Sequence, residues 1–204
     1  MLNTVTIGDG GLRSIGYRAF SGCERLSQIT IPDSVSSIGA YAFYRCSGLV
    51  TIALPENLTE IKEYTFYYCT SLVSLRFGSK VESIGNYAFY NCKMLENVEF
   101  PSSLTSIGRL SFVACDRFTI LEIPSNVTEI GEGAFNSCTN ISDVIIGEGV
   151  TVIGRSAFES CTSLRSVTFC DPDSWYVDGG NSFDVTYNDV NVRYLVAGHR
   201  FDKK

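Results

Sequence analysis

Seven of the eight cysteines in this chain recur at a constant spacing of 23 residues. Thiols in such a series could form disulfides, bind zinc or pack inside a core. Disulfides between neighbouring repeats are disfavoured, because stacked strands lie about 4.7–4.9 Å apart whereas a disulfide brings its Cβ atoms to about 3.8 Å. Zinc is disfavoured because the chain has no C-x-x-C motif and a single histidine. We therefore expect small, buried free thiols. The series consists of Cys23, Cys46, Cys69, Cys92, Cys115, Cys138 and Cys161.

Other residue types keep the same period and define a repeat, V-x-x-I-G-x-x-A-F-x-x-C-x-x-L-x-x-I-x-I-P. Its L-x-x-I-x-I part alternates apolar and polar residues, as a half-buried strand does, and proline often follows it. Its A-F-x-x-C part places three small or apolar residues on one face of a short helical or 3₁₀ turn. Neither part can bury its apolar face alone. Stacking in register, with the strands paired in parallel, gives a solenoid with one continuous core.

This unit resembles the BspA-like leucine-rich repeat, whose signature pairs L-x-x-I-x-I-P with I-G-x-x-A-F-x-x-C, over about residues 2–169. The resemblance implies an α/β repeat solenoid with one parallel β-sheet and short helical or 3₁₀ turns opposite. We expect residues 1–169 to form a first strand and seven 23-residue repeats. We expect residues 170–204 to form a degenerate last repeat, a C-terminal cap and a polar tail. In that segment Trp175, Phe183, Val192 and Tyr194 still follow the spacing of the repeat.

Composition and charge exclude several classes of function. A net charge of −6 argues against a nucleic-acid partner, since no basic patch is available to meet phosphates. No apolar run is long enough to span a membrane, and no signal peptide is visible. No nucleophile–base pair and no cofactor motif stands out, and the single histidine, His199, belongs to no recognisable catalytic motif. We therefore expect no cofactor, and an enzyme with an acidic site on the strand face is the least favoured hypothesis.

A protein-binding module is the favoured function, because a solenoid supplies a rigid and extended surface. The family resemblance implies a ligand-binding repeat region of an adhesion-type protein, at the cell surface or secreted, with a host matrix or cell-surface protein as partner. A structural spacer and an intracellular scaffold are the alternatives.

The outward positions of the strands change character in the middle repeats, where acidic residues and two isoleucines replace small polar residues. This mixture predicts a partner-binding surface, although an ordinary solvated face would carry the same residues. A second candidate is a double row of tyrosines, Tyr41, Tyr64 and Tyr87 beside Tyr44, Tyr67 and Tyr90, for which ring packing is the simpler explanation. The predicted binding residues are Arg76, Glu99, Ile120, Glu122, Asp143 and Ile145.

The sequence starts directly in its first expected strand, with no polar segment ahead of it. An open solenoid edge with unpaired strand groups favours self-association. We therefore expect either that more sequence precedes Met1 in the parent protein or that two copies meet end to end.

Overall fold

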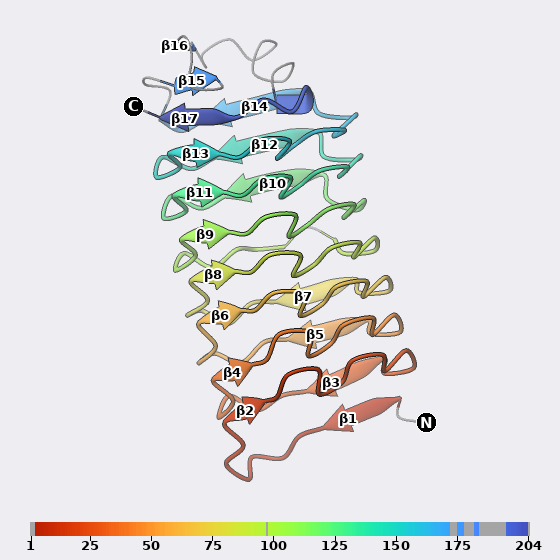
Figure 1. Ribbon diagram of the computed structural model, residues 1–204. Coiled ribbons are helices and arrows are strands. Elements are labelled where there is room, and N and C mark those ends of the chain that lie inside the picture. Colours follow the sequence, from red (N-terminus) through yellow and green to blue (C-terminus); the bar gives the residue numbers. More distant parts are fainter. Residues whose placement is uncertain (1–2, 97, 172–174, 178–181, 184–194, 204) are drawn as a thin grey trace.

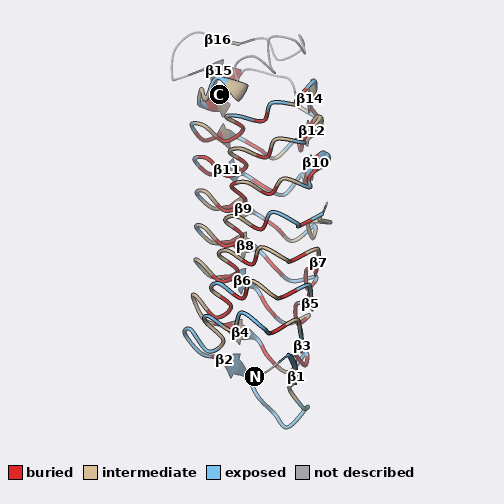
Figure 2. Cartoon of the chain, turned by 90° about the vertical axis from the view of Figure 1, so that its right-hand side faces the viewer, coloured by how far each residue is buried: buried red, intermediate tan, exposed pale blue. Residues whose placement is uncertain are grey.

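Each 23-residue repeat forms one coil, and about seven coils stack along a single axis (Figure 1). The computed structural model describes residues 3–96, 98–171, 175–177, 182–183 and 195–203. The burial colours repeat from coil to coil along the stack (Figure 2). The expected solenoid is therefore confirmed.

The first column of strands comes from the L-x-x-I-x-I part of the repeat, and its strands pair in parallel. Ile120 pairs with Asp143, which is one repeat further along the chain. Thr4 pairs with Gln28, because the first coil carries one extra residue. This column comprises β1 (Thr4–Thr6), β3 (Gln28–Thr30), β5 (Thr51–Ala53), β7 (Ser74–Arg76), β10 (Ile120–Ile123), β12 (Asp143–Ile146) and β14 (Ser166–Phe169).

A second column of short parallel strands comes from the residues just before the glycine of the repeat. The expectation of a single parallel sheet was therefore wrong. The glycine that follows most of these short strands allows a close approach between coils: a Cβ on Gly85 would lie 2.7 Å from the backbone nitrogen of Glu63. This column comprises β2 (Ser14–Ile15), β4 (Ser37–Ile38), β6 (Glu60–Ile61), β8 (Ser83–Ile84), β9 (Ser106–Ile107), β11 (Glu129–Ile130) and β13 (Val152–Ile153).

The A-F-x-x-C part does not form the expected helical or 3₁₀ turn. In each coil two residues four positions apart adopt a left-handed backbone, as Tyr41 and Arg45 do with φ values of 59° and 56°. A right-handed helix cannot contain such residues. The N–H groups of Tyr41 and Arg45 donate instead to the carbonyl groups of Glu63 and Tyr67 in the next coil, at 3.2 and 2.7 Å. Among the described residues only Leu195 and Val196 are helical. None of the described helical residues belongs to a helix that could cross a membrane.

The core consists of the repeat columns stacked on themselves. The rings of Phe43 and Phe66 stack with their centroids 5.3 Å apart, and those of Phe66 and Phe89 are 5.1 Å apart. Six of the seven repeat cysteines are buried, which confirms their expected burial, and Cys23 in the first coil is partly exposed.

The C-terminal segment closes the end of the stack with antiparallel strands, which the sequence did not predict. Strand β17 (Phe201–Lys203) pairs with β13 on one side and with β15 (Trp175–Val177) on the other. Strand β16 (Ser182–Phe183) pairs with β15. Phe201 and Trp175 are buried. The predicted places of Val192 and Tyr194 lie outside the described residues, so the division of residues 170–204 stays a prediction.

Candidate functional site

The strand alternation turns the predicted binding residues away from the core. In β10, Ile120 and Glu122 are exposed while Leu121 and Ile123 are buried, and Ile120 is 51% exposed. In β12 the outward residues Asp143 and Ile145 are half-buried. A row of acidic and aliphatic side chains therefore faces solvent on the middle coils.

The fourth coil interrupts this column of strands. Residues 98–100 form no strand, whereas β7 and β10 in the coils on either side do. Val98 and Phe100 are partly exposed, although Leu121 and Ile123 at the same repeat positions are 3% exposed. The interruption thus brings two core-column side chains to the surface.

The core beneath the interruption holds more large aromatic rings than the other coils. Phe100 meets Phe77 and Phe112 with centroid distances of 5.7 Å in both cases, and Phe112 also meets Phe118 at 5.8 Å. Most coils carry isoleucine or leucine where Phe77, Phe100 and Phe118 stand. Extra volume in a packed core displaces the backbone around it, which gives a physical reason for the break in the sheet.

A groove of about 580 Å³ opens beside residues 98–100 and runs across the strand ends of the following coils. Four of the six predicted residues line it, namely Glu99, Ile120, Glu122 and Ile145. Sequence reasoning missed its other walls, since most of them belong to core or turn columns. These are Val98, Phe100, Ile123, Pro124, Ser125, Gly147 and Cys170.

The other two predicted residues lie beside this groove. Arg76 lines a smaller neighbouring groove, of about 330 Å³, together with Glu99 and Phe100. Its guanidinium donates to the Glu56 carboxylate at 2.5 Å. The pKa of Glu56 is lowered to about 2, chiefly because the backbone N–H of Ser79 donates to the carboxylate and also because Arg76 does. Arg76 is therefore engaged in an ion pair.

Asp143 lies at the start of β12 and accepts a hydrogen bond from the hydroxyl of Ser142 at 2.5 Å. It does not line the groove of Ile120 and Glu122. The structure thus places four predicted residues around one hollow and two at its margins.

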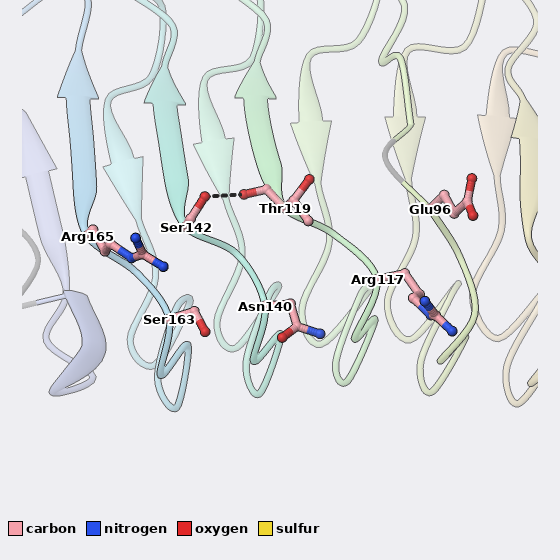
Figure 3. Close-up of a pocket in the computed structure, with 7 residues that line it drawn as sticks. All are labelled: Glu96, Arg117, Thr119, Asn140, Ser142, Ser163 and Arg165. Atoms are coloured by element: carbon pink, nitrogen blue, oxygen red, sulfur yellow. Dashed lines mark hydrogen bonds between the residues drawn. The ribbon is translucent and has the colours of Figure 1, made fainter.

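A second groove of about 640 Å³, lined by polar residues, lies where strands β10, β12 and β14 begin (Figure 3). The hydroxyl of Ser142 donates to the carbonyl of Thr119 at 3.1 Å. Sequence reasoning did not find this groove, because its residues occupy ordinary surface columns. Its walls are Glu96, Arg117, Thr119, Asn140, Ser142, Ser163 and Arg165.

The tyrosine rows stack as ring packing predicts. The ring centroid of Tyr64 lies 4.6 Å from that of Tyr41 and 4.7 Å from that of Tyr87. In the second row, the ring centroid of Tyr67 lies 5.1 Å from that of Tyr44 and 5.0 Å from that of Tyr90. Burial raises the pKa of Tyr67 above its ordinary value, and the neighbouring tyrosines add to the effect. The ring faces are covered by one another, so this surface presents ring edges and hydroxyl groups.

In the described part of the chain no three His, Cys, Asp or Glu side chains come together as a metal site. The strand face therefore offers shape, apolar surface and negative charge as its means of recognition.

Comparison of the chain with models of known protein families identifies its family. Residues 1–92 and 59–184 match the model of the BspA type leucine rich repeat region, described with six copies. The chain belongs to the BspA-type leucine-rich repeat family. The resemblance inferred from the repeat unit is thereby confirmed. Comparison with curated proteins found no match.

Solved structures support the same architecture. A leucine-rich repeat protein from T. pallidum is 25% identical, with a TM-score of 0.63, over 95% of this chain and 83% of that one. A leucine rich cell surface protein from Faecalibacterium prausnitzii is 26% identical, with a TM-score of 0.60, over 83% of this chain. The match spans 60% of the F. prausnitzii chain. The pneumococcal vaccine antigen PcpA, at 19% identity and a TM-score of 0.55, shares the fold.

Proposed function

We propose that this chain is a non-catalytic module that binds a protein partner through the strand face of its middle coils. The contact surface consists of Arg76, Glu99, Ile120, Glu122, Asp143 and Ile145. The module belongs to a cell-surface or secreted protein of the adhesion type, and its partner is a host matrix or cell-surface protein.

One observation carries this proposal: Ile120, at 51% exposure, stands in a groove whose walls include Glu99 and Glu122. An apolar side chain surrounded by polar groups is the usual arrangement of a binding hot spot. The stacked coils hold this surface rigid, so little ordering cost opposes binding. The open face does little to exclude water, which disfavours catalysis there.

The extracellular location is supported by similarity. The F. prausnitzii protein is described as a cell surface protein, and it shares 26% of its residues with this chain in the aligned region. The acidic balance of the groove favours a partner patch with positive charge, and hence binding that weakens as salt increases.

The test is the double substitution Ile120→Ser with Glu122→Lys, made against a partner found by screening extracellular-matrix and cell-surface proteins. We expect the affinity to fall at least tenfold, about 1.4 kcal/mol. Because both side chains point outward, the free energy of unfolding should change by less than about 0.5 kcal/mol per site.

The matched control is Thr51→Ser with Ala53→Lys, which changes the equivalent outward positions of β5 two coils from the break in the sheet. We expect this control to bind as the unaltered protein does. In the contrary outcome, the Ile120 and Glu122 variant binds the partner as tightly as the unaltered protein does, while substitution of Tyr64 and Tyr67 abolishes binding. That result would place the interface on the tyrosine rows. A screen in which no protein binds this face would favour the spacer function.

A further inference from the structure

Two arginines on the left-handed turns of the first coils lie against tyrosine rings. The guanidinium carbon of Arg18 is 5.0 Å from the ring centroid of Tyr41, and that of Arg45 is 5.3 Å from the ring centroid of Tyr44. The two tyrosine rings are themselves 5.5 Å apart. Both arginines are exposed, and among the described residues neither forms an ion pair with a carboxylate. Two positive charges without a carboxylate partner therefore flank a pair of tyrosines, although the chain carries a net charge of −6.

The tyrosine rows extend this cluster along the stack. At their far end Arg109 donates to the hydroxyl oxygen of Tyr87 at 3.2 Å, and its guanidinium carbon lies 5.9 Å from the centroid of that ring. Arginines thus stand at both ends of the rows. We call this surface the tyrosine face, which consists of the two rows of tyrosines together with Arg18, Arg45 and Arg109.

The turn itself does not require a tyrosine. Later coils carry Leu110, Gly133 and Ser156 at the positions of the first row, and these residues adopt the same left-handed backbone, with φ values of 53°, 62° and 57°. A bulky side chain is rare in this conformation, whereas glycine adopts it freely. Backbone strain that persists in one region of a structure points to a function there. The geometry of the turn therefore does not account for the tyrosines of the earlier coils.

The tyrosine face offers hydrogen-bond donors and positive charge. Guanidinium groups donate and do not accept. Burial raises the pKa of Tyr41, Tyr64 and Tyr67, so their hydroxyl groups stay protonated at neutral pH. The stacked rings cover one another's faces, which disfavours a ligand that binds by stacking, such as a nucleic-acid base. A ligand that fits this face is therefore rich in acceptor oxygens and negatively charged.

The spacing of the rows distinguishes between acidic polymers. An extended peptide places the side chains of one face about 6.6–6.8 Å apart, because every second residue points the same way. The tyrosine rings recur every 4.6 to 5.1 Å. Consecutive sugar residues of an extended polysaccharide recur at nearly this shorter spacing. A sugar chain that lies along the stack can therefore keep its register with the rows over several coils, and an extended peptide cannot.

We infer that the tyrosine face binds a linear acidic polysaccharide, which lies along the axis of the stack between Arg18 and Arg109. Arg18 and Arg45 contact carboxylate or sulfate groups of the sugar chain, as guanidinium groups commonly do. The hydroxyl groups of Tyr44 and Tyr67 donate to its oxygen atoms. None of these residues lines the strand-face groove. The inference thus adds a second site and does not depend on the proposed function.

The test measures the binding of fluorescent hexasaccharides to the complete chain by fluorescence anisotropy. A heparin hexasaccharide carries sulfate and carboxylate groups, a hexasaccharide of galacturonic acid carries carboxylate groups alone, and a glucose hexasaccharide carries no charge. Fluorescent hexaglutamate represents an acidic peptide. The comparison of the first two probes identifies the acidic group that the face binds.

We expect at least one acidic hexasaccharide to bind at least tenfold more tightly than both the glucose hexasaccharide and hexaglutamate. Its binding should weaken as salt increases. Arg18→Gln with Arg45→Gln should weaken it at least tenfold. Tyr44→Phe with Tyr67→Phe keeps the stacked rings and removes two hydroxyl groups, and it should also weaken binding at least tenfold.

The matched control is Arg117→Gln with Arg165→Gln, which removes the same charge from the polar groove (Figure 3). It should bind the acidic hexasaccharide as the unaltered protein does. Glu63 is exposed, and its charge adds to the effect of burial in raising the pKa of Tyr41. Glu63→Gln removes this negative charge from the neighbourhood of the rows, so it should strengthen binding.

Three results would overturn the inference. The first is that neither acidic hexasaccharide binds more tightly than the glucose hexasaccharide. The second is equally tight binding of hexaglutamate, which would assign the face to an acidic protein. The third is that the Arg117 and Arg165 variant loses binding while the Tyr44 and Tyr67 variant keeps it, which would place the sugar chain in the polar groove. Each leaves the proposed function standing, because that function is tested through Ile120 and Glu122.

Discussion

The Sγ atom of Cys92 lies 3.2 Å from the carbonyl oxygen of Phe66 in the preceding coil. That same oxygen accepts the backbone N–H of Cys69 at 3.1 Å. The thiol of one coil and the amide of the coil before it thus satisfy one carbonyl that the left-handed turn leaves inside the core. A small side chain with a weak donor suits this place, which explains a cysteine in every repeat. The six thiols that make this bond belong to Cys46, Cys69, Cys92, Cys115, Cys138 and Cys161.

These six thiols should be unreactive in the folded protein, because each is buried. A thiol reagent should modify exposed Cys170 rapidly and partly exposed Cys23 more slowly. The six should react only after denaturant is added, without any need for a reductant. Cys170→Ser is the control and should remove only the rapid phase. Mass-spectrometric detection of a disulfide between any repeat cysteines in the native protein would contradict this expectation.

Stability should fall at alkaline pH because of the same thiols. Burial raises the pKa of Cys46 and Cys161 from 9.0 to about 12. Burial raises the pKa of the other four thiols as well, those of Cys69, Cys92, Cys115 and Cys138. A raised pKa in the folded state means that the unfolded chain loses its protons first. The contribution of the protonated thiols to the free energy of unfolding is therefore complete below about pH 9 and is lost as the pH rises towards 12.

Urea unfolding at a series of pH values measures this loss. Above the unfolded pKa, each buried thiol steepens the fall in unfolding free energy by up to about 1.4 kcal/mol per pH unit. Cys115→Ala should be less stable at neutral pH and should lose stability less steeply between pH 9 and 10. Tyrosines ionise in both proteins, so the comparison isolates the thiol. Parallel curves for the two proteins would rule out this account.

Much of this fold could be predicted from the sequence, because each column of the repeat has one chemistry. Phe89 and Cys92 lie 23 residues from the same residue types in the neighbouring repeats. The strands pair with the same offset, as Ile120 does with Asp143. The left-handed turns could not be predicted, since the residues that adopt them include Tyr41 and Arg45 and not only glycine, which normally marks such a backbone. The strand at Phe201–Lys203 could not be predicted either, because it lies in a segment whose composition indicates a polar tail.

The candidate site was predictable in part. The period of two in a strand turns Ile120 and Glu122 outward, and the sequence shows this directly. The groove itself depends on the break at residues 98–100, where core-column residues do not pair. That break follows from the packing of aromatic rings between coils, such as the ring of Phe100 against those of Phe77 and Phe112. Packing between coils cannot be predicted from the sequence of a single repeat.

Replacing Ser111 by alanine should stabilise the protein. Ser111 is fully buried in a column that is otherwise mostly alanine, and its hydroxyl has no partner among the described residues. A buried polar group without a hydrogen bond costs about 1–3 kcal/mol. We expect Ser111→Ala to increase the unfolding free energy by about 1 kcal/mol in urea denaturation.

Thr65 provides the matched control, since it stands at the same repeat position and is equally buried. Its hydroxyl donates to the carbonyl of Lys62 at 2.7 Å. Thr65→Ala removes that bond and should therefore decrease the unfolding free energy, by about 1 kcal/mol. If both variants have a lower free energy of unfolding, the hydroxyl of Ser111 does not destabilise the protein.

We expect a protein made of residues 1–204 alone to self-associate through its first coil. Leu12 and Tyr17 are 40% and 64% exposed. A Cβ on Gly39 would lie 2.5 Å from the backbone nitrogen of Tyr17, whereas one on Gly16 would meet nothing within 4 Å. Strands β1 and β2 each pair on one side only within the described residues. This face therefore has the apolar side chains and the unpaired backbone groups that favour pairing with another chain.

At the opposite end of the stack β17 lies against β13. We therefore expect two copies to meet through their first coils, in a symmetric contact that forms a closed dimer. We expect sedimentation velocity to show a monomer–dimer equilibrium, and Leu12→Lys with Tyr17→Glu to make the protein monomeric. The control is Val50→Lys with Met94→Glu, two side chains 40% and 38% exposed on other coils, and it should still dimerise. A protein that stays monomeric at every concentration, or a control that also abolishes the dimer, would show that this edge does not mediate association.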